Sequence, residues 1–231
     1  MSDFPNTDGL SASEFWIQAW EEAAASDLRV GNDTEEERFW QGYAPAYDDR
    51  NPLAPYTQEL MKQVYAYLKA DDRLLEIGPG TGGFTQLLAP HVGELALVEP
   101  STSMFEVLCH NWAKLVAPLP QLLAVKWEEA PEVEADVVFS ANAFYRIRDM
   151  KDSLLKMHQT ARRHVFLVQS IGQPFAGPLR VTENGEPQER VRAEVISSIL
   201  DELNIEHHYA TFPVQRKSGE IHDVALIHWS V

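Results

Sequence analysis

The stretch Leu75-Glu-Ile-Gly-Pro-Gly-Thr-Gly-Gly-Phe84 carries the strongest indication of the fold, because an apolar run ends there in a glycine-rich turn. The run, residues 73–77, is typical of a buried strand, and a helix is expected over about residues 82–88. Gly78, Gly80 and Gly82 permit positive φ and let a ligand approach the backbone closely. The helix that follows offers unpaired N–H groups beside that ligand. The stretch therefore predicts a strand, a ligand-binding turn and a helix.

The same alternation of strand and helix continues along the chain. Four further apolar runs are typical of strands, at residues 94–98, 121–127, 136–139 and 164–169, and helices are expected over 102–115 and 150–160. Strands that are apolar throughout and alternate with helices indicate a parallel sheet with both faces covered. The sequence thus predicts a doubly wound α/β fold.

The last third of the chain departs from this pattern. Residues 172–185 are expected to form a loop, and residues 187–203 a helix. Two β-rich runs follow, at 205–214 and 221–229, and Arg216-Lys-Ser-Gly219 joins them. Glycine in a short polar connection is typical of a hairpin, so the last strand should enter the sheet antiparallel. The expected fold is a mostly parallel, seven-stranded sheet that ends in an antiparallel hairpin.

Residues 1–70 form a separate helical segment in this interpretation. A first helix can be capped by Ser11 or Ser13, and a second is expected to begin at Thr34, which has Glu37 at capping-box spacing. A third helix is expected over about residues 56–68. The Glu35-Glu-Glu37 run is most simply a solvent-exposed first turn, where acidic groups favour the helix dipole. The aromatic residues of the segment must cover an apolar surface; they are Trp16, Trp20, Phe39, Trp40, Tyr43 and Tyr47.

Composition excludes several classes of function. The net charge of −16 disfavours nucleic acid, because affinity for phosphate backbones rests on Lys and Arg, and it also disfavours an anionic membrane surface. No apolar run approaches the roughly 20 residues that span a bilayer, and no secretory signal is visible. The single cysteine, Cys109, rules out an internal disulfide. We therefore expect a cytoplasmic protein without membrane contact.

Two kinds of cofactor fit the glycine turn: a nicotinamide dinucleotide, and a nucleoside that carries a methionine moiety. Gly78, Gly80 and Gly83 satisfy the dinucleotide pattern G-x-G-x-x-G, and Glu99 ends the next strand, where a carboxylate can accept hydrogen bonds from both hydroxyls of a ribose. Glu76 discriminates between the two. A carboxylate beside a diphosphate would be costly, whereas a carboxylate beside the ammonium group of a methionine moiety would be attractive.

At these residues the sequence resembles the class I S-adenosylmethionine-dependent methyltransferases. Glu76-Ile-Gly-Pro-Gly-Thr-Gly82 matches the first motif of that family, E-x-G-x-G-x-G. Val98-Glu-Pro-Ser-x-x-Met104 is similar to the second motif, and Ala135-Asp-Val-Val-Phe-Ser140 to the motif of the fourth strand. The resemblance covers about residues 43–231. It implies a Rossmann-like fold and S-adenosylmethionine as the cofactor.

The resemblance also implies roles for individual residues. Glu76 and the Gly78–Gly82 turn would hold the methionine end of the cofactor, Glu99 the ribose hydroxyls and Met104 one face of the adenine. Trp127 and Glu128 would supply a stacking surface and a hydrogen-bond acceptor for the adenine, in place of the usual aspartate. The expected cofactor-binding residues are Tyr43, Tyr47, Glu76, Gly78, Gly80, Gly82, Glu99, Pro100, Met104, Trp127, Glu128 and Ser140.

The acceptor side is expected after the fourth strand, in Ser140-Ala-Asn-Ala-Phe-Tyr-Arg146. Asn142 to Tyr145 resembles the N-P-P-Y-type motif of methyltransferases that act on nitrogen atoms of bases, but it lacks both prolines. We expect Asn142, Tyr145 and Arg146 to bind the acceptor. No catalytic acid or base is assigned. The histidines at 207, 208, 222 and 228 are more simply structural than a metal site, since neighbouring strand residues face opposite sides.

The sequence therefore predicts a methyltransferase that moves the sulfonium methyl group to a small molecule by in-line displacement. An NAD-dependent oxidoreductase and a non-catalytic cofactor-binding protein remain as alternatives. Residues 71–231 would form the methyltransferase domain and residues 1–70 an N-terminal helical cap, of which residues 1 to about 50 are predicted to be a lid that orders when the cofactor binds. Tyr43 and Tyr47 are expected nearest the ligand, with Trp16 and Trp20 packed behind them.

Overall fold

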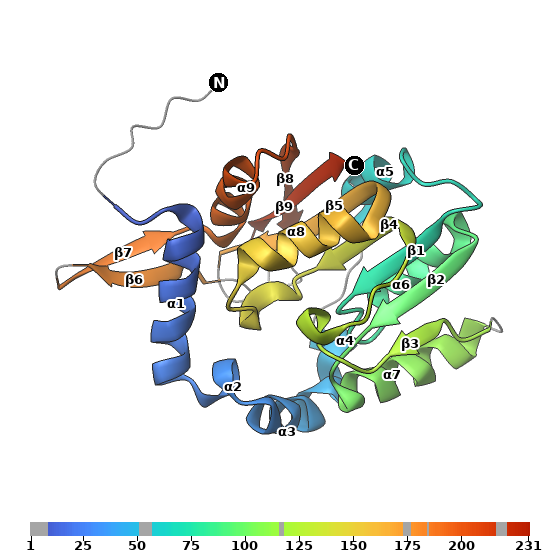
Figure 1. Ribbon diagram of the computed structural model, residues 1–231. Helices are drawn as coiled ribbons and strands as arrows, with labels where there is room; N and C mark the ends of the chain where they lie inside the picture. Colours follow the sequence, from blue (N-terminus) through green and yellow to red (C-terminus); the bar gives the residue numbers. More distant parts are fainter. Residues whose placement is uncertain (1–8, 51–56, 116–117, 173–176, 184, 216–220) are drawn as a thin grey trace.

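One mixed sheet organises the molecule (Figure 1). The computed structural model describes residues 9–50, 57–115, 118–172, 177–183, 185–215 and 221–231. Within them seven strands pair in the order β3-β2-β1-β4-β5-β9-β8, and β6 and β7 form a separate two-stranded sheet. The strands are β1 Arg73–Ile77, β2 Glu94–Val98, β3 Gln121–Leu123, β4 Ala135–Ala141, β5 Ala161–Ile171, β6 Leu179–Glu183, β7 Glu186–Arg190, β8 His208–Gln215 and β9 Ile221–Ser230.

Helices cover both faces of the sheet, as the sequence predicts. They are α1 Ala12–Ser26, α2 Leu28–Gly31, α3 Asp33–Tyr43, α4 Tyr47–Arg50, α5 Thr57–Tyr65, α6 Gly83–Leu88, α7 Thr102–Trp112, α8 Met150–Thr160 and α9 Arg192–Glu202. Successive residues of a strand point to opposite faces, so both layers draw on β1: Leu75 packs in the core beneath α1, α8 and α9, and Leu74 packs with α5 and α6. None of the described helices is long and apolar enough to cross a membrane.

The strand directions confirm the predicted topology. β1 pairs in parallel with both β2 and β4, and β9 is antiparallel to β5 and to β8. The order reverses between β1 and β4, because the chain proceeds from β1 outward to β3 and then returns to β4. In doubly wound sheets ligands bind at the carboxyl ends of the strands at such a switch point. The turn expected at residues 216–219 lies outside the described residues.

The predicted loop at 172–185 is wrong from Leu179 onward, because the strands of a hairpin form there; residues 173–176 and 184 lie outside the described residues. Strands β6 and β7 pair antiparallel, with Leu179 opposite Arg190, and the predicted helix at 187–203 begins only at Arg192. Leu179 and Val181 are buried, and β6 packs across α1 (Figure 1). The hairpin is therefore stabilised by apolar contact with α1, which the spacing of prolines and glycines does not reveal.

The N-terminal helices also differ in detail from expectation. Ser11 caps α1 in a capping box with Glu14. Asn32 rather than Thr34 caps α3, since its side chain accepts hydrogen bonds from the N–H groups of Thr34 and Glu35. Helix α5, assigned above to the N-terminal segment, packs in the core of the sheet through its apolar face. The division of the chain at residue 70 stays a prediction.

Candidate functional site

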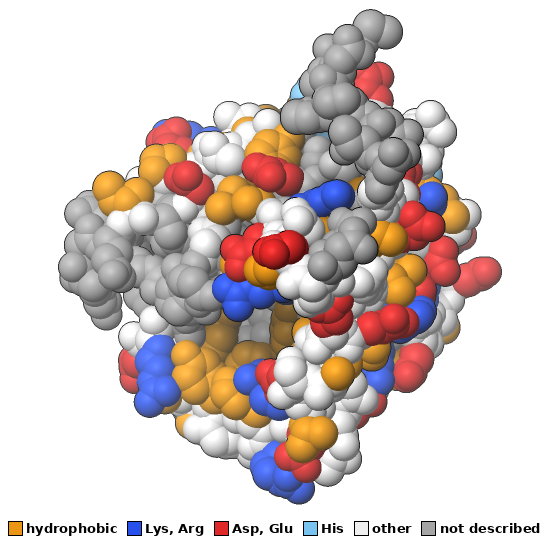
Figure 2. Space-filling view, turned by 90° about the vertical axis from the view of Figure 1, so that its left-hand side faces the viewer, with side chains coloured by type: hydrophobic (Ala, Val, Ile, Leu, Met, Phe, Trp, Pro, Cys, Tyr) orange, Lys and Arg blue, Asp and Glu red, His pale blue; other side chains and the backbone are white. Residues whose placement is uncertain are grey.

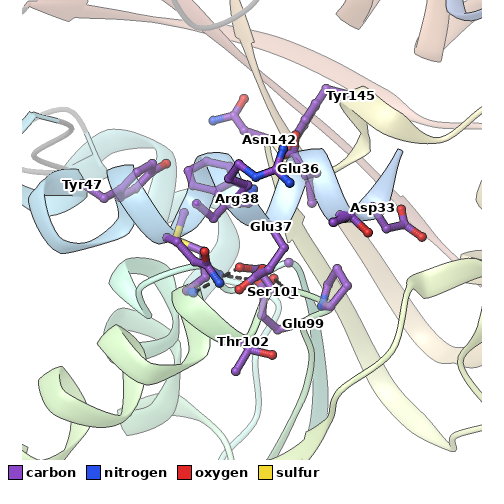
Figure 3. A pocket seen from close by; sticks show the side chains of 18 of the residues that line it. Asp33, Glu36, Glu37, Arg38, Tyr47, Glu99, Ser101, Thr102, Asn142 and Tyr145 are labelled. Atoms are coloured by element: carbon purple, nitrogen blue, oxygen red, sulfur yellow. Dashed lines mark hydrogen bonds between the residues drawn. The ribbon is translucent and has the colours of Figure 1, made fainter. Parts of the chain in front are cut away.

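A cavity of about 600 Å³ lies at the carboxyl ends of β1, β2 and β4, beneath α3 (Figure 3). Its walls come from three parts of the chain: the α3 segment, the turns after β1 and β2, and the turn after β4. The lining residues are Asp33, Thr34, Glu36, Glu37, Arg38, Trp40, Gln41, Tyr47, Gly78, Gly80, Glu99, Pro100, Ser101, Thr102, Met104, Ala141, Asn142, Ala143 and Tyr145. The cavity thus occupies the switch point that the topology provides.

The glycine turn after β1 forms the floor of the cavity. Gly78 has φ +67° and Gly80 φ +57°, a region that side chains other than glycine rarely adopt. A Cβ atom on Gly78 would lie 2.4 Å from the Cβ of Ala143, so the turn packs directly against the segment after β4. At Gly80 the nearest atom to such a Cβ would be the Cε of Met104 at 3.8 Å. Gly80 therefore leaves open space facing the cavity.

Glu99 at the end of β2 is held by backbone groups. Its Oε2 accepts from the N–H of Gly80 at 3.0 Å, and its Oε1 accepts from the N–H of Ser101 at 2.9 Å. The side chain is buried, and this burial raises the pKa of Glu99 to about 7 despite the two hydrogen bonds. Glu37 adds to the increase through its negative charge. The carboxylate is thus fixed between the glycine turn and α7, where further donors would stabilise its charged form.

Glu76 is a buried carboxyl group next to the same turn. Only 1% of the residue is exposed, and its Oε2 has no hydrogen-bond partner among the described residues. Burial raises the pKa of Glu76 to about 8, and the charge of Glu99 adds to the effect. Glu76 does not line the cavity itself, but the buried oxygen without a partner is the kind of atom that a cationic ligand group would satisfy.

The remaining residues expected to hold the cofactor fall into two groups. Pro100 and Met104 line the cavity, and the N–H of Met104 is capped by the hydroxyl of Ser101. Trp127 is buried in the core, where its indole N–H donates to the carbonyl of Ser153 at 3.4 Å, and the side chain of Glu128 is exposed. The structure does not bring Trp127 and Glu128 to the cavity. Gly82 and Ser140 support it from outside, the hydroxyl of Ser140 bonding to the carbonyl of Ile77 at 2.9 Å.

The α3 segment covers the cavity and is anchored by carboxylates. Glu37 accepts from the N–H and the hydroxyl of Ser103 in α7, at 3.0 and 2.7 Å. Asp48 accepts from the hydroxyl of Thr81 at 2.5 Å and from the amide of Asn111 at 2.7 Å. Helices α3 and α4 therefore rest on both the glycine turn and the helix that follows β2.

Of the aromatic residues in this segment, Trp40 and Tyr47 line the cavity. Tyr43 lies behind that wall, stacked on Phe39 at 5.3 Å between ring centroids. The expectation that Trp16 and Trp20 pack behind the tyrosines is wrong. Their indole N–H groups donate to the carbonyls of Ile147 and Arg146, both at 2.7 Å, so α1 is hydrogen-bonded to the segment after β4.

The turn after β4 forms the opposite wall. Asn142 has φ +54°, and its Oδ1 accepts from the N–H of Ser170 at 2.7 Å, which fixes the orientation of the amide. Tyr145 lines the cavity as well, and its hydroxyl donates to Glu36 (Figure 3). The guanidinium of Arg146 instead bonds to Asp33 at 2.8 Å and to the carbonyl of Val30. Arg146 therefore positions the start of α3 and does not line the cavity.

Sequence reasoning missed the acidic residues of α3. Glu36 was expected in a solvated turn, yet it is only 5% exposed and pairs with Arg29. A usable indication was present in the spacing, because Glu36 lies four residues before Trp40 and seven before Tyr43, on one face of the helix. No group of three potential metal ligands occurs among the residues that the structure describes.

Comparison with known proteins agrees with this geometry. The sequence matches the family described as Methyltransferase domain over residues 47–209, more than half of the chain. No curated protein matches it significantly. Among solved structures, the N-methyltransferase NodS from Bradyrhizobium japonicum WM9, in complex with S-adenosyl-L-homocysteine, is similar at a TM-score of 0.57 and 17% identity, covering 92% of this chain and 98% of that one.

Two further structures show the same likeness. Magnesium protoporphyrin IX methyltransferase from Synechocystis PCC 6803 has a TM-score of 0.53 at 14% identity, covering 75% of this chain and 83% of that one. Precorrin-6y C5,15-methyltransferase from Geobacter metallireducens GS-15 has a TM-score of 0.53 at 14% identity, covering 75% and 88%. At these identities the likeness concerns the fold. The matched family, the strand order and the motif residues together place the chain in the class I S-adenosylmethionine-dependent methyltransferases, with S-adenosylmethionine as its cofactor.

Proposed function

We propose that the protein transfers the methyl group of S-adenosylmethionine to a small molecule that binds between the glycine turn and α3. One observation carries this proposal: a single cavity of about 600 Å³ joins Gly80 and Glu99 on one side to Asn142, Tyr145 and the polar face of α3 on the other. That volume is within the range of small-molecule sites, roughly 300–1,000 Å³. It offers space for a cofactor and a compact acceptor under one cover.

The cofactor half is formed by residues that fit its chemistry. Glu99 would accept hydrogen bonds from the ribose hydroxyls, and Met104 would pack against the adenine. The buried oxygen of Glu76 that lacks a partner would meet the ammonium group, directly or across a water molecule. Tyr47 would close the site from the lid segment. When bound, the cofactor supplies an electrophilic methyl group on a positively charged sulfur atom.

The protein's contribution to the reaction is mainly positional. Gly78 is in contact with Ala143, so the turn after β4, which carries Asn142 and Tyr145, lies beside the methionine end of the cofactor site. Because the Oδ1 of Asn142 is bonded to Ser170, the Nδ2 is the atom that would orient an acceptor. Holding the two reactants in line replaces a bimolecular encounter by an oriented one, which supplies much of the rate. Helix α3 excludes water from the same space.

A small acceptor is favoured over nucleic acid by charge. The chain has a net charge of −16, and four of the lining residues are Asp or Glu against one Arg. On the face drawn in Figure 2, the described Lys and Arg side chains are scattered among Asp and Glu rather than gathered in a basic patch. The similar structures include enzymes named for the small molecules magnesium protoporphyrin IX and precorrin-6y, so this fold accommodates such acceptors. The single cysteine agrees with a reducing, cytoplasmic setting.

The proposal is tested by following a labelled methyl group. The protein is incubated with S-adenosylmethionine carrying a tritiated methyl, together with a low-molecular-mass cell extract, transfer RNA or unfolded protein. We expect label in the small-molecule fraction, and loss of that label in the Glu99→Ala variant. Label that enters only RNA or protein would contradict a small-molecule acceptor.

A further inference from the structure

A tyrosine, a glutamate and an arginine form a hydrogen-bonded chain that begins in the cavity wall. The hydroxyl of Tyr145 donates to the Oε1 of Glu36. Arg29 donates two hydrogen bonds to the same carboxylate: its Nε lies 2.9 Å from Oε2, and its Nη2 lies 3.3 Å from Oε1. The guanidinium of Arg29 in turn lies 3.4 Å from the ring centroid of Phe39. Each member of the chain is therefore oriented by the next.

The arrangement differs from an ordinary ion pair because two of its members face the cavity. Glu36 and Tyr145 both line it, although Glu36 is only 5% exposed. A forked arginine contact fixes the plane of a carboxylate, which leaves Oε1 aimed at the tyrosine. The hydroxyl of Tyr145 donates its proton to Glu36 and its oxygen accepts from the side chain of Trp40, which leaves one lone pair that can accept a hydrogen bond from a ligand. Figure 3 shows Tyr145 and Glu36 pointing toward each other beside Asn142.

We propose that Tyr145 and Glu36 form a proton relay for the methyl acceptor, an inference that rests on the function proposed above. A lone pair of the acceptor heteroatom forms the new bond to the methyl carbon, and the electrons of the carbon–sulfur bond remain on sulfur. The acceptor's proton moves to the oxygen of Tyr145 while the hydroxyl proton moves to the Oε1 of Glu36. A sulfonium and a carboxylate become a thioether and a carboxylic acid, so the net charge of the cavity does not change.

The relay restricts the class of acceptor. The attacking atom must carry a proton that it loses, as in a phenol, an alcohol, a thiol or an N–H group. A tertiary amine or a thioether has no proton on its attacking atom, so the relay would not accelerate its methylation. Tyr145 would be the residue that touches the acceptor, and Glu36 would act through Tyr145.

The surroundings of the chain suit a carrier that stays protonated between turnovers. Although 37% of Tyr145 is exposed, burial of its hydroxyl end and the negative charge of Glu36 raise its pKa well above the ordinary value, whereas the Trp40 hydrogen bond and the charge of Arg146 act in the opposite direction. Arg29 on α2 is paired with Glu36, and Asp33 on α3 is paired with both Arg146 and Lys126; Glu37 and Arg38 of α3 line the same cavity. The hydroxyl of Tyr145 therefore remains a proton donor to Glu36 at neutral pH.

The test compares variants with a matched control on a defined panel of acceptors. Tyr145→Phe removes one hydroxyl and keeps the ring, and Glu36→Gln removes the proton acceptor. Tyr65→Phe is the control, because that hydroxyl donates to the carbonyl of Leu87 on the far side of the glycine turn's helix. Each protein is assayed with phenols, primary amines and thiols across a range of pH, and its affinity for S-adenosylhomocysteine is measured by calorimetry.

We expect kcat to fall about 100-fold or more in Tyr145→Phe, the contribution typical of proton transfer, with unchanged affinity for S-adenosylhomocysteine and with normal activity in Tyr65→Phe. Glu36→Gln should lower kcat in the same way, because it removes the group that receives the proton; if it does not fold, Tyr145→Phe carries the test. Full activity of Tyr145→Phe would overturn the relay and leave methyl transfer intact. A parallel loss of cofactor affinity would show that the contact only anchors α3. If the wild-type protein labels a component of the low-molecular-mass extract but no member of the panel, the relay fails and the small-molecule function stands; if it labels neither, both fail.

Discussion

Glu37 of α3 accepts hydrogen bonds from both the N–H and the hydroxyl of Ser103 in α7, at 3.0 and 2.7 Å. This pair joins α3, which lines the cavity through Glu37, to the helix that follows β2. It also places a negative charge at the N-terminus of α7, where the helix dipole favours it. The contact therefore satisfies an N–H group at the start of α7 and also joins α3 to that helix.

The first prediction concerns this contact between α3 and α7. Glu37→Ala should release α3, since a charge-assisted hydrogen bond contributes about 1.5–3 kcal/mol, and amide hydrogen exchange in residues 35–50 should become faster. S-adenosylhomocysteine should slow exchange in the same residues of the wild-type protein. Glu35→Ala is the control, because Glu35 pairs with Arg38 within α3. Equal protection of residues 35–50 with and without the ligand would mean that the segment is static packing.

The second prediction separates two roles of Gly80 in the turn after β1: it adopts a positive φ, and it leaves open space in the cavity. Gly80→Val should lose binding of S-adenosylhomocysteine, because a branched side chain would project into the cavity at a residue with φ +57°. Gly185→Val, at φ +84° in the β6–β7 turn, carries the same backbone strain of about 1–3 kcal/mol without touching the cavity. Both variants should be less stable in thermal unfolding, and only Gly80→Val should fail to bind. Normal binding by Gly80→Val would show that the turn only redirects the chain and does not contact the ligand.

The third prediction follows from the buried carboxyl groups. Burial raises the pKa of Glu76 to about 8 and that of Glu99 to about 7 in the free protein. The folded chain thus holds protons that the unfolded chain releases near pH 4.5, so these groups make the free protein less stable as pH rises from 4.5 to 8. Donors on the ligand favour the charged forms, so binding should release protons and affinity should increase up to about pH 8.

Thermal unfolding with and without S-adenosylhomocysteine checks this linkage. The increase in Tm caused by a fixed excess of ligand should be larger at pH 8 than at pH 6, because tighter binding stabilises the folded state more. Calorimetric enthalpies should depend on the ionisation enthalpy of the buffer. A Tm increase that is the same at both pH values would show that neither carboxyl group changes its protonation on binding.

The sheet could be predicted from the sequence because its physical causes are local. The runs at 73–77 and 94–98 became β1 and β2 with the same bounds, since a strand that is apolar throughout fits only the middle of a covered parallel sheet. The hairpin β6–β7 could not be predicted in this way. Its buried residues, Leu179 and Val181, depend on contact with α1, which is distant in sequence.

The residues of the candidate site could likewise be predicted only where their positions have local causes. The positions of Gly80 and Glu99 follow from a motif within one strand–turn–helix unit, and both line the cavity. The place of Trp127 after the third strand predicts a contact with the adenine, but its indole packs against α8 instead. Glu36 and Glu37 acquire their roles from Tyr145 and Ser103, over separations of 109 and 66 residues. Such pairs depend on how α3 docks, and no local pattern encodes that docking.

Binding calorimetry on the wild-type protein and on Glu99→Ala, with S-adenosylhomocysteine and with NAD, tests the cofactor assignment most directly. The wild-type protein should bind S-adenosylhomocysteine and not NAD. Glu99→Ala should lose about 1.5–3 kcal/mol of that binding, roughly 10- to 100-fold in Kd, because two ribose hydroxyls lose their charged acceptor. Binding of NAD alone, or an unchanged affinity of Glu99→Ala for S-adenosylhomocysteine, would contradict this assignment of the site.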